Sequence, residues 1–117
     1  MKLTNVKELL NAQVLAGEEY LEREVNSACG SDLMSDVLAF VKNQALLLTG
    51  LVNAQVIRTA EMMDIKAVVF VRGKKVPEDV IELAKEYSMV IMSTTLSMYP
   101  SCGKLYSAGL AGGEEHL

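Results

Sequence analysis

More than half of the chain alternates short apolar runs with amphipathic segments, and this alternation constrains the fold more than any other feature. The runs ALLLTG (45–50), KAVVFV (66–71) and MVIMST (89–94) have the length and continuous apolar character of strands buried on both faces. The segments 53–64 and 77–88 between them carry apolar residues at helical spacing. Strands that recur at intervals of about 20 residues with helices between them predict right-handed crossovers and a parallel sheet covered on both faces. We therefore expect an α/β fold with three α/β/α layers around a mainly parallel central sheet.

The residues before this alternation predict shorter elements. We expect a helix over 4–11, a strand over 12–17 and a second strand near 23–29. The second strand is rich in charged residues, which discourage pairing with other chains, so we place it at an edge of the sheet.

Two more helices complete the predicted fold. One begins near Ser31, a good N-cap residue, and its apolar stripe is Leu33, Val37, Leu38 and Val41. The other follows the last strand, over 96–110, after an interruption at Pro100. We expect a single domain over residues 1–110 and a flexible tail over 111–117.

Composition narrows the classes of function. Half of the 117 residues are hydrophobic and only 5% are aromatic, so the core must be mostly aliphatic. A net charge of -4 argues against nucleic acid as a partner, because phosphate binding needs clustered cations. No apolar run approaches the roughly 20 residues that span a bilayer, so no membrane contact is expected. We expect a cytoplasmic protein with Cys29 and Cys102 reduced, without cofactor or metal.

The ends of the predicted strands supply the candidate site. Ligands of open parallel sheets bind beyond the carboxyl ends of the strands. Those ends are small, polar or cationic in this sequence, and the fold would gather them at one edge. With the start of the 31–43 helix, they give these candidate ligand-binding residues: Ser31, Asp32, Thr49, Asn53, Arg72, Gly73, Lys74, Lys75, Ser93, Thr94 and Thr95.

The basic stretch RGKK at 72–75 allows two interpretations. Its cations, with the helix N-terminus near Pro77, could hold a phosphate or a carboxylate. It could instead be a solvated loop whose glycine permits a positive φ. Glu78 and Asp79 favour the second interpretation, because they serve the helix dipole themselves and repel an anion.

The other candidates also have two interpretations. Asp32 and Asp36 are spaced to share a helix face, so they could contact a ligand, or they could stabilise the helix start together with Ser31. The hydroxyls of residues 93–95 could donate to a ligand or cap the last helix.

No catalytic residues are predicted. Cys102 would need a nearby base, and the single histidine, His116, lies in the predicted flexible tail.

Several segments resemble the DRTGG domain family. They are SDLMSDVLAFVKN (31–43), the long stretch from LLLTG to VIMST (46–94) and GKLYSAG (103–109). The resemblance covers roughly residues 1–110 and is closest to short stand-alone members. It implies a three-layer α/β/α fold like the N-terminal domain of HPr kinase. The family signature has an Asp-Arg pair and a Thr-Gly-Gly, where this chain has Leu51-Val52-Asn53 and Val71-Arg72-Gly73.

The resemblance implies a regulatory or ligand-sensing module without enzymatic activity. With the edge residues, it predicts a small anionic or nucleotide-like ligand. The methionine-rich apolar surplus favours a homodimer. The alternatives are a structural or protein-interaction subunit of a larger complex, and a small enzyme.

Overall fold

A five-stranded mixed sheet forms the centre of the computed structural model, which describes residues 1–40 and 45–111. Its strand order is β1-β5-β4-β3-β2. The strands are β1 (Gln13–Ala16), β2 (Ser27–Gly30), β3 (Ala45–Thr49), β4 (Ala67–Phe70) and β5 (Val90–Ser93). Strands β2 to β5 are mutually parallel, and β1 pairs with β5 in the antiparallel sense. The predicted mainly parallel sheet is confirmed, and β2 lies at an edge as expected.

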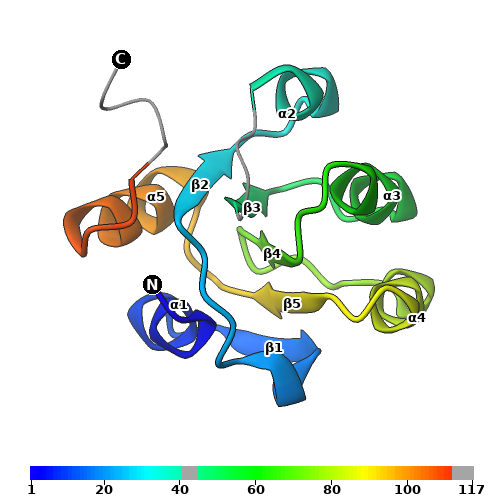
Figure 1. The fold of residues 1–117 in the computed structure, drawn as a ribbon, viewed down its shortest axis with the longest axis horizontal. Helices are drawn as coiled ribbons and strands as arrows, with labels where there is room; N and C mark the ends of the chain where they lie inside the picture. Colours follow the sequence, from blue (N-terminus) through cyan, green and yellow to red (C-terminus); the bar gives the residue numbers. More distant parts are fainter. Residues whose placement is uncertain (41–44, 112–117) are drawn as a thin grey trace.

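Helices cover both faces of this sheet, which confirms the three-layer prediction. Helices α2, α3 and α4 lie on one face, and α1 and α5 lie on the other (Figure 1). Their bounds are α1 (Leu3–Leu10), α2 (Met34–Phe40), α3 (Ala54–Met62), α4 (Glu78–Glu86) and α5 (Met98–Ser107), with a short 3₁₀ helix, η1, at Glu18–Tyr20. No helix in residues 1–40 and 45–111 is long and apolar enough to cross a membrane.

The core is divided in two by the sheet. Successive side chains of a strand point to opposite faces, so Leu47 and Phe70 pack against helices α2 to α4, whereas Leu46 and Val69 pack against α1 and α5. All residues of β3 and β4 are buried. This burial on both faces explains why these strands are continuous apolar runs in the sequence.

Helix α2 differs most from its prediction. It begins at Met34, so Ser31 is not its N-cap; the Ser31 hydroxyl instead accepts a hydrogen bond from the Leu33 N–H at 3.0 Å, before the helix starts. Of the predicted stripe only Val37 is buried, while Leu33 is 58% and Leu38 46% exposed. Val41 lies outside the described residues. The helix covers the end of the sheet, where α3 is its one neighbour in the layer, and so buries a narrow face.

Helix α5 also differs from its prediction. Pro100 does not interrupt it but is its third residue. The first N–H groups of a helix have no intrahelical partner, so a proline in the first turn removes no hydrogen bond. Beyond the C-terminal end of α5, the Ala111 carbonyl accepts a hydrogen bond of 3.1 Å from the Ala28 N–H of β2. The remainder of the predicted tail lies outside the described residues.

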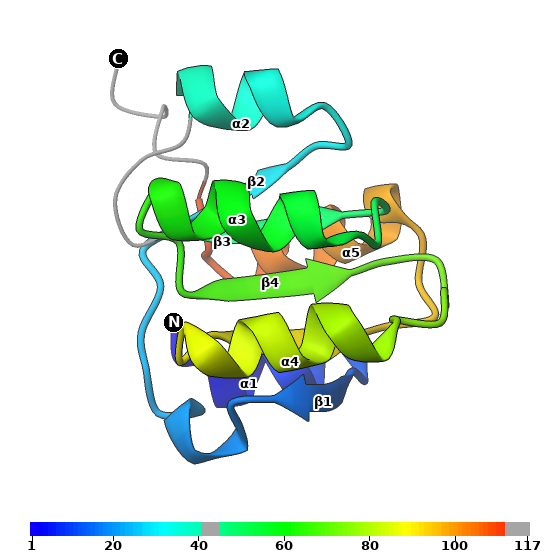
Figure 2. The same ribbon diagram turned by 90° about the vertical axis from the view of Figure 1, so that its right-hand side faces the viewer.

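The parallel strands end at one common edge. Helices α2, α3 and α4 lie side by side, and β4 points toward the edge where the chain turns into these helices (Figure 2). We call this the carboxyl edge of the sheet. It holds the loops that follow β2, β3, β4 and β5.

Candidate functional site

Backbone hydrogen bonds join the loops of the carboxyl edge. The Val71 N–H donates to the Thr49 carbonyl at 3.0 Å, which links the ends of β4 and β3. The Gly73 N–H donates to the Thr94 carbonyl at 2.9 Å, which links the loop after β4 to the end of β5. The structure therefore brings together the ends of β3, β4 and β5, as expected from the sequence.

Asp32 lies at the centre of this edge. Its Oδ1 accepts hydrogen bonds from the Gly50 N–H at 2.6 Å and from the Thr49 hydroxyl at 3.2 Å. Its Oδ2 pairs with Nη2 of Arg72 at 2.5 Å. Asp32 comes from the loop after β2, so one carboxylate connects the loops after three neighbouring strands. Its function in the fold is this connection rather than capping of α2.

The partners of Asp32 keep its carboxylate charged. The Gly50 N–H has the largest effect and lowers the pKa of Asp32 below its ordinary value of 3.8. Arg72 and the Thr49 hydroxyl lower this pKa further, while partial burial opposes them. Hydrogen bonds to the charged form and an adjacent cation both favour ionisation. The carboxylate is thus a fixed negative charge at neutral pH.

Arg72 has an uncommon backbone conformation. Its φ is 72°, in the left-handed region that non-glycine residues seldom adopt. The Arg72 N–H donates to the Leu96 carbonyl at 2.8 Å, which fixes the loop in this conformation. Residues in such conformations cluster at ligand-binding and active sites. We therefore regard Arg72 as the strongest single candidate in the site.

The rest of the basic stretch has mixed functions. Gly73 has a φ of 63°, as its place in a tight loop suggested. The Lys74 ammonium donates to the Gly50 carbonyl at 2.6 Å and so helps to hold the edge together. Lys75 is exposed to solvent. Of these cations, Arg72 is held at the centre of the edge by Asp32, and Lys75 adds an exposed charge in the same loop.

Several predicted residues serve the fold itself. Asn53 caps α3, because its side chain accepts a hydrogen bond from the Val56 N–H at 3.1 Å. The buried Thr94 hydroxyl donates to the carbonyl of Leu10 at 2.8 Å and ties the end of α1 to this edge. Ser93 is half-buried and Thr95 is exposed, so their contact with a ligand stays a prediction.

A hollow of about 440 Å³ opens at the carboxyl edge between the loop after β2 and the start of α5. We call it the carboxyl-edge hollow. Its lining residues are Gly30, Ser31, Asp32, Arg72, Ser97, Met98 and Tyr99. Three of the predicted residues, Ser31, Asp32 and Arg72, therefore lie around one hollow, and the end of β2 and the start of α5 form the remainder of its wall.

The contribution of α5 was not predicted. A Cβ on Gly30 would lie 2.8 Å from the Cys102 sulfur and 3.0 Å from the Met98 sulfur. The glycine therefore lets α5 pack closely on the end of β2. The sequence contains a signal for this approach, a glycine at the end of an edge strand, but does not reveal which helix approaches.

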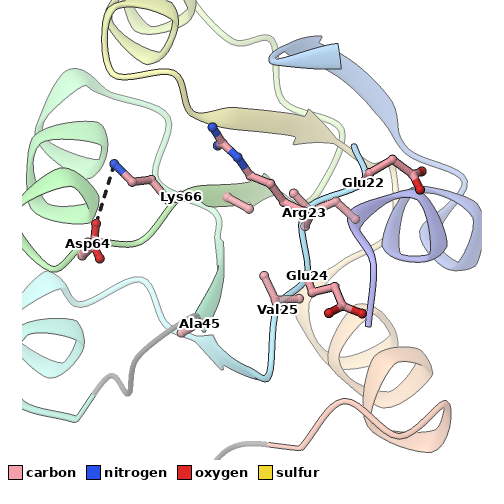
Figure 3. A pocket seen from close by; sticks show the side chains of 9 residues that line it. Glu22, Arg23, Glu24, Val25, Ala45, Asp64 and Lys66 are labelled. Atoms are coloured by element: carbon pink, nitrogen blue, oxygen red, sulfur yellow. Dashed lines mark ion pairs between the residues drawn. The ribbon is translucent and has the colours of Figure 1, made fainter. Parts of the chain in front are cut away.

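A second hollow lies at the opposite, amino edge of the sheet and has a volume of about 500 Å³ (Figure 3). Its lining residues are Leu3, Glu22, Arg23, Glu24, Val25, Ala45, Asp64, Lys66 and Ala67.

The cations of this amino-edge hollow already have partners. Arg23 donates to the Ser88 carbonyl at 2.6 Å and lies 4.0 Å from the Tyr20 ring centroid. Lys66 pairs with Asp64 at 3.7 Å and with Glu61 at 3.6 Å. Although this hollow is the larger of the two, three carboxylates line it against two cations, which disfavours an anion. We therefore place the candidate site at the carboxyl edge.

Cys102 is half-buried, and this burial raises the pKa of its thiol. His116 lies outside the described residues. Within the described part of the chain, no group of three or more histidine, cysteine, aspartate or glutamate side chains could hold a metal ion.

The fold and the site define a class of protein, a three-layer α/β domain with a cationic, polar edge at the ends of its parallel strands. Comparison with family models identifies the family: the DRTGG domain model matches residues 5–107. The chain belongs to the DRTGG domain family, which confirms the resemblance seen in the sequence. A search of the curated proteins found no match.

Among solved structures, the chain is similar to the CBS and DRTGG domains of the regulatory region of a pyrophosphatase from Clostridium perfringens, in complex with the activator diadenosine tetraphosphate. The TM-score is 0.73 at 17% sequence identity. The match covers 89% of this chain and 45% of that chain. The likeness shows a shared fold, and this chain spans less than half of that regulatory region.

Proposed function

We propose that this protein is a non-enzymatic regulatory module that senses a small anionic or nucleotide-like ligand at the carboxyl edge of its sheet. The observation that carries the proposal is the pair of Asp32 and Arg72. A guanidinium has about five N–H donors in a fixed plane, which suits phosphate and carboxylate groups. Asp32 holds one of its nitrogens, and the side chain still lines the carboxyl-edge hollow.

Membership of the DRTGG family supports a regulatory function. The structural neighbour is a regulatory region that binds a nucleotide activator, which supports a nucleotide-like ligand for this chain. That the module works in the cytoplasm, as expected from the sequence, is part of the same proposal.

A thermal-shift screen of nucleotides and phosphorylated metabolites tests the proposal. A ligand at 100 times its Kd stabilises the folded state by about 2.7 kcal/mol, which is readily measured. The shift should disappear in Arg72→Gln and shrink in Lys75→Ala. Lys85→Ala, an exposed cation on α4, is the matched control and should keep the full shift. A screen without any hit, or a hit that Arg72→Gln leaves unchanged, would contradict an anion site at this edge.

We also propose that the chain forms a homodimer through α2. Leu33, just before α2, and Leu38 within it are exposed. Two exposed leucines beside the edge strand β2 favour a second copy that covers this end of the sheet, although Ala111 already accepts a hydrogen bond from Ala28 of β2. Light scattering after size exclusion should give the mass of a dimer for the wild type and of a monomer for Leu33→Ser/Leu38→Ser. Met62→Ser, which changes an exposed residue of α3, is the control. A monomeric wild type at micromolar concentration would end the dimer proposal.

A structural subunit of a larger complex is the alternative function. The groove between α1 and α5, which includes Leu9, Pro100 and Ala108, is mostly apolar and favours it. A stable protein partner found together with no ligand shift would support this alternative. Turnover of a nucleotide that Asp32→Asn abolishes would instead support a small enzyme.

A further inference from the structure

We propose that the ligand of the carboxyl-edge hollow is a nucleotide, with its base on Tyr99 and its phosphates on Arg72. This inference rests on the proposed function and specifies its ligand. It assigns the two parts of the ligand to two different segments of the chain, the first turn of α5 and the loop after β4.

The first turn of α5 provides a surface for a base. Tyr99 is 88% exposed, although it lines the hollow, and Met98 beside it is half-buried. An exposed aromatic ring next to a thioether offers a flat apolar contact on which a base can stack. Neither side chain would serve a ligand that is only an anion.

The loop after β4 provides the charge. The Arg72 side chain is 44% exposed, so it remains accessible while Asp32 holds it in place. Lys75 in the same loop adds a second exposed cation. We place the phosphates on the Arg72 nitrogens that Asp32 does not hold, beside Lys75, because the Asp32 carboxylate repels them from the loop after β2.

Asp32 itself fits the sugar of a nucleotide. An ionised carboxylate has about four acceptor sites, and Gly50, Thr49 and Arg72 engage three of them. The remaining site can accept a hydrogen bond from a hydroxyl group such as those of ribose. An inorganic polyphosphate has no comparable donor.

The size of the hollow is also appropriate for a nucleotide. Its volume of about 440 Å³ lies within the range of roughly 300–1,000 Å³ that is usual for small-molecule sites. Ser97 makes no side-chain cap at the start of α5, so it leaves the N–H groups of Met98 and Tyr99 uncapped at the same hollow, and Pro100 has no N–H. This helix start adds a favourable position for negative charge but is not required for the inference.

Isothermal titration calorimetry of the full chain with ADP, pyrophosphate and adenosine tests the assignment. We expect ADP to bind at least about tenfold more tightly than either fragment, because both parts contribute. Tyr99→Ala should weaken ADP by about tenfold and leave pyrophosphate unchanged. Tyr106→Ala, which removes an exposed ring of the same helix outside the hollow, should change neither. Arg72→Gln should weaken both ADP and pyrophosphate.

The outcomes separate this inference from the proposed function. If pyrophosphate binds as tightly as ADP, and Tyr99→Ala has no effect, the nucleotide inference is wrong and the anion site remains. If adenosine binds as tightly as ADP, the assignment of the phosphates to Arg72 is wrong. If none of the three probes binds, the nucleotide inference is overturned, and the metabolite screen then decides the proposed function. Circular dichroism of each variant confirms that a lost affinity does not reflect unfolding.

Discussion

The guanidinium of Arg72 lies against the Cα of Gly50. A Cβ at residue 50 would come within 2.7 Å of Cζ and 2.8 Å of Nε of Arg72. The two residues follow adjacent parallel strands, in which Thr49 pairs with Phe70. The position of the candidate anion-binding side chain thus depends on a missing side chain in the neighbouring loop.

Gly50→Ala should therefore affect binding more than stability. The clash is with the far end of a flexible side chain, so Arg72 can move away at a cost of about 1 kcal/mol or less. Its pairing with Asp32 should be lost, and the affinity for the ligand should fall as in Arg72→Gln. Unfolding in urea and calorimetry measure the two effects. Retained affinity in Gly50→Ala would contradict the account.

Gly103→Ala is the matched control for that substitution. A Cβ at Gly103, within α5, would meet nothing within 4 Å. Because alanine is the better helix former, the free energy of unfolding should rise by about 0.5–1 kcal/mol. Ligand affinity should not change.

Asp32→Asn should lower stability in a pH-dependent way. The pKa of Asp32 is lowered in the folded state, so its contribution is present above the unfolded pKa and is lost as the pH falls through the folded pKa. The difference in unfolding free energy between wild type and Asp32→Asn should be constant above about pH 5 and should shrink below about pH 4.

Urea unfolding at a series of pH values measures this difference. Repeating the comparison in an Arg72→Gln background should reduce the pH dependence without removing it, because the Gly50 N–H is the larger cause of the lowered pKa. A pH-independent difference would show that Asp32 is not held as described.

Thr94→Val should destabilise the fold clearly. The substitution keeps the shape of a buried side chain but leaves the Leu10 carbonyl without its 2.8 Å hydrogen bond. We expect a loss of about 1–3 kcal/mol. Thr95→Val, at the exposed neighbouring position, should change stability by no more than about 0.5 kcal/mol. Equal effects of the two substitutions would argue against the bond from Thr94 to α1.

Arg72→Gly and Arg72→Gln should differ in stability although both remove the ion pair. Glycine accepts the φ of 72° without a steric penalty, whereas glutamine does not. We expect Arg72→Gly to be more stable than Arg72→Gln by about 0.5–1 kcal/mol. Chemical denaturation of both variants checks this; if Arg72→Gln is the more stable, the backbone at residue 72 is not strained.

Much of this fold could be predicted from the sequence because its central strands are buried on both faces. Strands β3, β4 and β5 have no polar interruptions, and the helices between them carry clear periodic patterns. The convergence of the loops at one edge then follows from parallel strand direction. Helix α2 was harder, because Leu33 and Leu38 match the pattern of a buried stripe, although the end of the sheet offers only one neighbour to bury them.

The details of the site depend on long-range contacts that local patterns do not encode. Asp32 stands in a sequence pattern that is typical of a helix N-terminus. Its hydrogen-bond partners nevertheless lie 17–40 residues away in the sequence. Tyr99 reaches the carboxyl-edge hollow only because α5 crosses to the face opposite α2, α3 and α4. Nothing in the sequence around Tyr99 indicates that crossing.

The central claim is that the carboxyl edge, and not the amino edge, binds the ligand. Titration of ¹⁵N-labelled protein with ADP, followed by two-dimensional NMR, tests it most directly. We predict that the amide signals of Gly50, Gly73 and Tyr99 shift in proportion to saturation, while those of Glu24 and Lys66 stay in place. Shifts concentrated at Glu24 and Lys66, around the amino-edge hollow, would contradict the account.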